Sequence, residues 1–83
     1  MTDKDTLRAM TRILRDLLMD ETIDLKTNTK REDVPGWDSL MYINFIAAVE
    51  AEFGVKFAVG DIESFANVGE IANKAVELSR SAS

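Results

Sequence analysis

The run from Ser39 to Phe53 constrains the fold most, because it contains neither glycine nor proline and only two charged residues, Glu50 and Glu52. Its composition predicts a helix. Apolar residues recur at the spacing of a core-facing stripe: Tyr42, Phe45, Ile46, Val49 and Phe53. Other apolar residues of the run lie off that stripe: Leu40, Met41, Ile43, Ala47, Ala48 and Ala51.

A helix that is apolar nearly all round is either buried or docks a partner. A chain of 83 residues has one modest core, so complete burial of this helix is hard to arrange. We therefore expect a semi-exposed apolar face that begins beside Ser39. The alternative is that the third helix and a loop cover this face, since few monomers expose large apolar patches.

Two segments precede this helix. Leucine and methionine residues at helical spacing predict a first helix over about 3–19. Residues 20–38 lack such periodicity and predict a long loop, which is uncommon in a small domain and is usually functional or mobile. Ile23 and Leu25 are the apolar residues that we expect to pin this loop to the core.

Two segments follow it. We expect a short helix over about 61–65 and a last helix over about 68–80, which Asn67 caps with Glu70 placed as in a capping box. The fold class is therefore all-α. The prediction for 1–83 is a single domain, built as a small up-down bundle of three main helices plus one short helix.

Charge is distributed unevenly along the chain. Residues 1–31 carry six acidic and seven basic side chains, whereas residues 32–77 carry nine acidic side chains against Lys56 and Lys74 alone. The acidic part includes Ser39. Negative potential of this kind repels nucleic acid and anionic membranes and attracts basic protein surfaces.

The residue types that are missing exclude several chemistries. With no cysteine and no histidine, the chain can form no disulfide and no metal site of the Cys or His type. We therefore expect no bound metal, and a cytoplasmic location fits the composition. No apolar run approaches the length of a membrane span, so we expect no membrane insertion.

Ser39 follows Pro35, Gly36 and Asp38, and it begins the second helix. One interpretation is capping, because Asp38 is a preferred N-cap residue and a neighbouring serine is common. A catalytic serine would need a general base, usually histidine, and we expect no enzyme. A third interpretation is that another enzyme attaches a phosphodiester-linked group to Ser39. The unpaired amides and the dipole at a helix start favour such an anion.

Three motifs then indicate a family. Trp37-Asp38-Ser39-Leu40, Glu52-Phe53-Gly54-Val55 and Asn67-Val68-Gly69-Glu70-Ile71 follow one another at a spacing that resembles the acyl carrier proteins. The resemblance covers nearly the whole chain. It implies a 4'-phosphopantetheine arm on Ser39, installed from coenzyme A by a phosphopantetheinyl transferase. An acyl or aminoacyl group would then be held as a thioester on the arm, with no catalytic residue in the chain.

The resemblance also implies a surface for partner enzymes, which are the transferase and an acyl- or aminoacyl-activating ligase or synthase. Asp38 would cap the helix beside the arm. The expected docking residues are Leu40, Met41, Ile43, Asn44, Ala47, Glu50 and Glu63. We expect a monomer. The competing hypothesis is an unmodified helical interaction module that binds a partner through the apolar face of the second helix.

One departure from the family pattern bears on the pathway. Members that serve fatty-acid synthesis typically carry acids along the second helix, where this chain has Met41, Asn44 and Ala51. A tryptophan before Asp-Ser-Leu is similar to specialised carriers that serve dedicated ligases or secondary pathways. We therefore expect a specialised discrete carrier.

Overall fold

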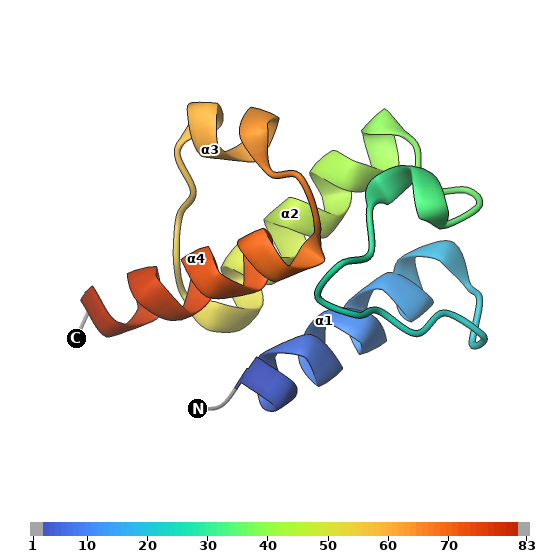
Figure 1. The fold of residues 1–83 in the computed structure, drawn as a ribbon, viewed down its shortest axis with the longest axis horizontal. Helices are drawn as coiled ribbons and strands as arrows, with labels where there is room; N and C mark the ends of the chain where they lie inside the picture. The colour runs from blue at the N-terminus through green and yellow to red at the C-terminus, as the bar shows by residue number, and fades with distance from the viewer. Residues whose placement is uncertain (1–2, 82–83) are drawn as a thin grey trace.

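The computed structural model describes residues 3–81, and every regular element in this range is helical, as the sequence predicts (Figure 1). The elements are α1 (Asp3–Leu18), the 3-10 turn η1 (Arg31–Asp33), α2 (Ser39–Phe53), α3 (Val59–Ser64) and α4 (Val68–Ser81). Three main helices and one short helix therefore make up the described part of the bundle.

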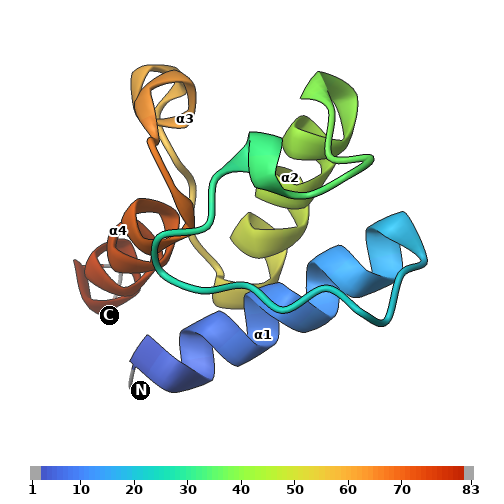
Figure 2. The same ribbon diagram turned by 45° about the vertical axis from the view of Figure 1, so that its right-hand side comes forward.

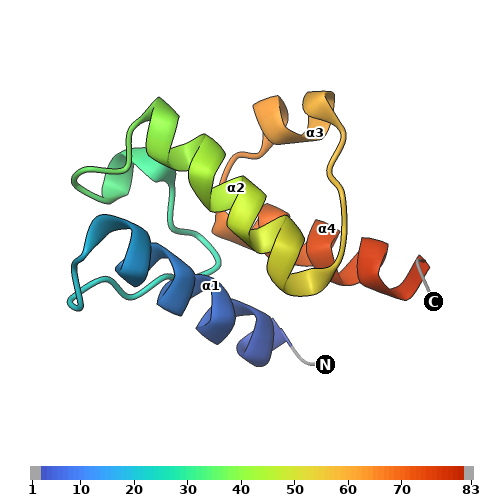
Figure 3. The same cartoon turned by 180° about the vertical axis from the view of Figure 1, so that it is seen from behind.

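The three long helices α1, α2 and α4 all contact one another, while the short α3 stands at one end of the bundle beside α2 (Figures 1 and 3). The core comprises the side chains of Met10, Leu14, Ile23, Leu25, Trp37, Phe45, Ile46, Val49, Phe57, Val68, Ile71, Ala72 and Ala75. Each long helix thus buries one apolar stripe against the other two, as helices of a small bundle must.

Two helix boundaries differ from the sequence-based prediction. The first helix ends at Leu18, because Met19 has a left-handed backbone with φ 52° and closes the helix. The short helix begins at Val59 rather than near Asp61, because the Ile62 amide already donates to the Ala58 carbonyl at 3.1 Å.

The long loop between α1 and α2 passes between α1 and α4 and is hydrogen-bonded to both (Figure 2). Ile23 and Leu25 are buried, as predicted, and the Leu25 amide donates to Thr11 Oγ1 of α1. Farther along, the Val68 and Gly69 amides at the start of α4 each donate at 2.8 Å to loop carbonyls, those of Thr29 and Thr27. The loop therefore satisfies part of the unpaired N-terminus of α4.

The connector between α3 and α4 forms a second cap at the start of α4 with the side chains of Asn67 and Glu70. The Glu70 amide donates to Asn67 Oδ1 at 3.0 Å, and Glu70 Oε1 accepts from the Ala66 amide at 2.9 Å. The predicted cap is confirmed, with the acid reaching one residue farther back than in the usual capping box.

Candidate functional site

The start of α2 presents Ser39 on the surface. Gly36 takes a left-handed backbone with φ 85°, which turns the chain toward the helix. Asp38 is the N-cap residue, and its Oδ1 accepts a hydrogen bond from the Met41 amide at 2.9 Å. Ser39 is the first residue of the helix and its side chain is exposed.

Trp37 anchors this turn in the core. Its side chain is only 4% exposed, and its ring centroid lies 5.1 Å from that of Phe45 in an edge-on arrangement. A buried aromatic two residues before Ser39 fixes where the helix begins, because the indole contributes a large buried area at a defined position. The serine hydroxyl therefore projects from a rigid support and not from a free loop.

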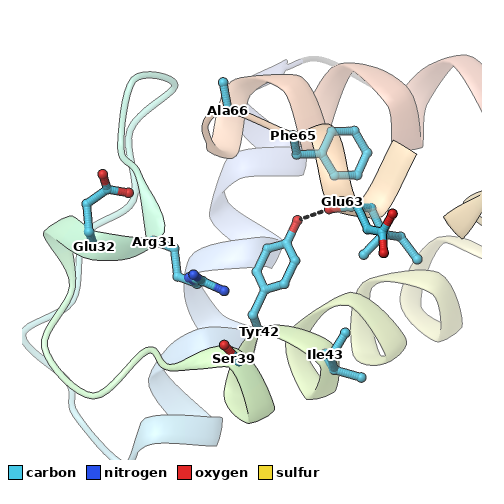
Figure 4. Close-up of a pocket in the computed structure, with 9 residues that line it drawn as sticks. Arg31, Glu32, Ser39, Tyr42, Ile43, Glu63, Phe65 and Ala66 are labelled. Atoms are coloured by element: carbon cyan, nitrogen blue, oxygen red, sulfur yellow. Dashed lines mark hydrogen bonds between the residues drawn. The ribbon is translucent and has the colours of Figure 1, made fainter. Parts of the chain in front are cut away.

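A pocket of about 340 Å³ opens beside Ser39 between η1, α2 and α3 (Figure 4). It is lined by Arg31, Glu32, Ser39, Tyr42, Ile43, Ile62, Glu63, Phe65 and Ala66. The wall is mixed, with apolar side chains inside and exposed charged ones from η1 and α3 around them. Such a space suits a ligand that is itself part apolar and part polar.

Tyr42 joins the three elements around the pocket. Its hydroxyl donates to the Ile62 carbonyl at 2.8 Å, which ties α3 to α2. The Arg31 guanidinium lies over the Tyr42 ring, 5.5 Å from its centroid, which ties η1 to the same side chain. Burial raises the pKa of the Tyr42 phenol, and the charge of Arg31 opposes this shift.

The predicted docking residues fall into groups. Ser39, Ile43 and Glu63 line the same pocket. Exposed positions along α2 are occupied by Leu40, Ile43, Asn44 and Ala47, with Leu40 69% and Ile43 54% exposed. The semi-exposed apolar face expected from the sequence is therefore present at the start of α2.

Two of the predicted docking residues, Met41 and Glu50, make contacts within the fold itself. Met41 is half-buried against the core. Glu50 lies toward the other end of α2, and its Oε2 accepts a hydrogen bond from the Phe57 amide at 2.8 Å. That bond holds the connector between α2 and α3, so the Glu50 carboxylate is less free to meet a partner than the sequence suggested.

Sequence reasoning missed Arg31 and assigned Tyr42 to the core alone. Both line the pocket beside Ser39. The one available signal was that Arg31 is the last base before the acidic segment begins. Spacing along the chain gave no indication, because Arg31 and Tyr42 meet only once the loop has folded back over α2.

Two negative observations apply to the described range. Within residues 3–81, no group of three or more carboxylates could hold a metal ion. No helix there is long and apolar enough to span a bilayer.

Comparisons with known proteins identify a matching family and a similar solved structure. The family described as the phosphopantetheine attachment site matches residues 8–74. The fold is similar to the solution NMR structure of holo acyl carrier protein from Geobacter metallireducens. The TM-score is 0.85 at 34% identity, and the match covers 93% of this chain and 88% of that chain.

Because the family match spans most of the sequence, the chain belongs to the phosphopantetheine-attachment family of acyl carrier proteins. Its function is to carry acyl groups, and its prosthetic group is a covalently attached 4'-phosphopantetheine. The resemblance drawn from the three sequence motifs is thereby confirmed. The residues at the start of α2 fit such a group, since an exposed hydroxyl stands at a helix N-terminus beside a pocket.

Proposed function

We propose that Ser39 Oγ carries the 4'-phosphopantetheine arm, and that acyl or aminoacyl groups travel as thioesters on its terminal thiol. The supporting observation is the position of Ser39, which is exposed, first in α2 and on the wall of the pocket. Asp38 rather than Ser39 caps the helix, so the serine hydroxyl is not needed for folding. The reactive sulfur comes with the cofactor, since the chain has no cysteine.

The test is intact-mass measurement after incubation with coenzyme A, Mg²⁺ and a phosphopantetheinyl transferase. The native chain should gain one phosphopantetheine mass. Ser39→Ala should gain none while keeping its stability. Ser64→Ala is the matched control, because Ser64 is also an exposed helical serine and should leave the modification unchanged. A native chain that gained no mass would instead support the unmodified interaction module.

We propose further that partner enzymes dock on the exposed start of α2. Leu40 and Ile43 offer apolar area, Asn44 and Ala47 extend the same helix, and Glu63 adds a negative charge from α3. The partners are the transferase and an acyl- or aminoacyl-activating ligase or synthase. In this role the chain transports groups and catalyses nothing itself. A monomer suffices for this role, and a reducing cytoplasm would keep the thiol of the arm free.

We also propose that this is a specialised carrier rather than one for central fatty-acid synthesis. The support is the small number of acids on α2, where Asn44 and Ala47 are exposed and uncharged and Glu50 is held by the Phe57 amide. Fewer rim charges should make binding less dependent on salt. The dissociation constant for the transferase should therefore change little between low and physiological salt, and a steep rise would contradict the proposal.

A further inference from the structure

We propose that Arg31 is the counter-ion of the phosphodiester that joins the arm to Ser39. The contact would hold the first part of the arm at the mouth of the pocket. This inference rests on the proposed attachment at Ser39, and it concerns a residue that the sequence motifs do not include.

Arg31 and Ser39 line the same pocket, and Figure 4 shows the Arg31 side chain reaching from η1 toward Tyr42 on the side where α2 begins. Arg31 is the only basic residue among those lining this pocket. A phosphodiester on Ser39 Oγ would therefore share the pocket with one protein cation, although Ser39 itself lies in the acidic part of the chain, residues 32–77.

Arg31 has no carboxylate partner of its own in the described part of the chain. Within residues 3–81, ion pairs join Arg12 to Glu52, Lys26 to Asp24, and Lys74 to both Asp61 and Glu77. None involves Arg31. Glu32 and Glu63 also line the pocket, but both are exposed and neither is paired with this guanidinium. Its contact is the face of the Tyr42 ring, which leaves its N–H donors available.

The Arg31 guanidinium is already positioned over the Tyr42 ring before any anion binds. The Tyr42 ring is fixed by its hydrogen bond to the Ile62 carbonyl, so the surface on which Arg31 rests is itself held in place. A guanidinium that is already positioned loses less conformational freedom when it binds an anion. Stacking on an aromatic ring is compatible with such binding, because the ring occupies the face of the guanidinium and leaves its edge free.

The phosphodiester is a better candidate for this contact than an anionic cargo. Its phosphorus would be bonded to Ser39 Oγ, so the phosphate stays beside the pocket whatever the arm carries. It keeps its negative charge throughout the ordinary pH range, and the planar fork of arginine matches phosphate oxygens. The unpaired amides at the start of α2 favour an anion at the same place. A cargo carboxylate, by contrast, would lie at the far end of a flexible arm.

The test compares the unmodified and the modified chain, the latter with a free thiol and no cargo. Urea unfolding gives the ratio of the two unfolding equilibrium constants for the native chain, Arg31→Gln and Lys30→Gln. Lys30→Gln is the matched control, because Lys30 carries the same charge one position before Arg31 but does not line the pocket. ³¹P NMR of the modified chain reports on the phosphate itself.

Arg31→Gln should lower the ratio of the two unfolding equilibrium constants, which measures how much modification stabilises the fold. The expected decrease is about fivefold, which corresponds to the upper end of the range for an exposed ion pair. The substitution should also shift the phosphorus resonance. Lys30→Gln should do neither. The difference should disappear near 1 M salt, where the screening length falls to about 3 Å.

An equal ratio in the native chain and in Arg31→Gln, with an unmoved phosphorus resonance, would overturn the proposal. Arg31 would then act only on Tyr42, because a purely structural role destabilises both forms alike. A native chain that gained no mass from the transferase would overturn the attachment at Ser39 itself. Mass measurement before unfolding therefore separates the two failures.

Discussion

Helices α2 and α4 are similar in length, and both begin at a capped N-terminus, yet they use their apolar residues differently. In α4 the buried apolar residues form one stripe, while charged residues occupy the other side. In α2 the stripe of Phe45, Ile46 and Val49 is buried, but Leu40 and Ile43 remain exposed. Every large apolar side chain of the α4 stripe packs in or against the core, whereas only some of the large apolar side chains of α2 do so. The exposed apolar residues of α2 lie next to Ser39, on the surface where we propose that partner enzymes dock.

The largest expected effect comes from truncating the same residue type on the two helices. Ile71 of α4 is 2% exposed and Ile43 of α2 is 54% exposed. Ile71→Ala should lower the free energy of unfolding by about 2–5 kcal/mol, because it removes buried methyl groups and leaves a cavity. Ile43→Ala should lower it by less than about 0.5 kcal/mol. Urea unfolding measures both.

The same pair separates folding from docking. Ile43→Ala should slow modification by the transferase while leaving the fold intact. Similar losses of stability in the two variants would show that the start of α2 is packed as tightly as α4, and the contrast between the helices would not hold.

The next effect concerns two glycines in helices. A methyl group on Gly69 of α4 would lie 2.7 Å from the Thr27 carbonyl oxygen, which is backbone and cannot swing away. Gly69→Ala should therefore cost about 1–3 kcal/mol and loosen the long loop. Gly60 of α3 has open space around it, so Gly60→Ala should stabilise the chain by about 0.5–1 kcal/mol.

Thermal unfolding of the two variants checks this pair. Opposite shifts of the melting temperature would show that the loop is packed on α4 while the space around Gly60 of α3 is open. A tolerated Gly69→Ala would mean that the loop can move away from α4, contrary to the two hydrogen bonds that join them.

Much of this contrast could be predicted from the sequence, because it depends on local patterns. The stripe of α2, its surplus apolar residues and the Asn67–Glu70 cap all follow from spacing along one helix. Ile23 and Leu25 stood out as the apolar residues of a polar loop. The all-helical class followed from these elements together.

The parts that could not be predicted depend on contacts between distant segments. Arg31 meets Tyr42 only when η1 folds over α2, and Tyr42 meets Ile62 only when α3 is in place. Glu50 was expected to face partners, but the Phe57 amide that it binds lies beyond the end of its helix. The sequence did not indicate the early start of α3, because a glycine commonly marks a turn, whereas Gly60 lies inside the helix.

A smaller effect is expected from the caps of the two helices. Asp38→Ala and Asn67→Ala should each cost about 1 kcal/mol, since each removes the acceptor for one amide. Their local consequences should differ. Asn67→Ala leaves α4 tied to the loop by its backbone bonds, whereas Asp38→Ala leaves the first turn of α2 without its side-chain cap.

Hydrogen exchange at the Met41 and Glu70 amides measures this difference. Met41 should lose protection strongly in Asp38→Ala, and modification at Ser39 should slow. Asp38→Asn is the control, because an asparagine side chain can accept the same bond. Normal modification of Asp38→Ala would show that the transferase does not need an ordered first turn.

The smallest effect is expected at Tyr42, which is half-buried between the core and the pocket beside Ser39. Tyr42→Phe removes the hydrogen bond to the Ile62 carbonyl and should cost about 0.5–1 kcal/mol at neutral pH. Burial raises the pKa of Tyr42 in the folded chain, so the folded state holds the phenol proton more tightly than the unfolded state. Its contribution is therefore complete below the ordinary tyrosine pKa of about 10 and is lost as the pH rises through the folded value.

The native chain should consequently lose stability more steeply than Tyr42→Phe as the pH rises above about 10. Tyr42 is the only tyrosine, so the variant removes all phenol titration and leaves every other ionisable side chain of the sequence in place. Urea unfolding at a series of alkaline pH values, with phenolate absorbance recorded in parallel, gives both the slope and the pKa. Parallel slopes would mean that the phenol is solvated in the folded chain, and α3 would then be free of α2 at the edge of the pocket.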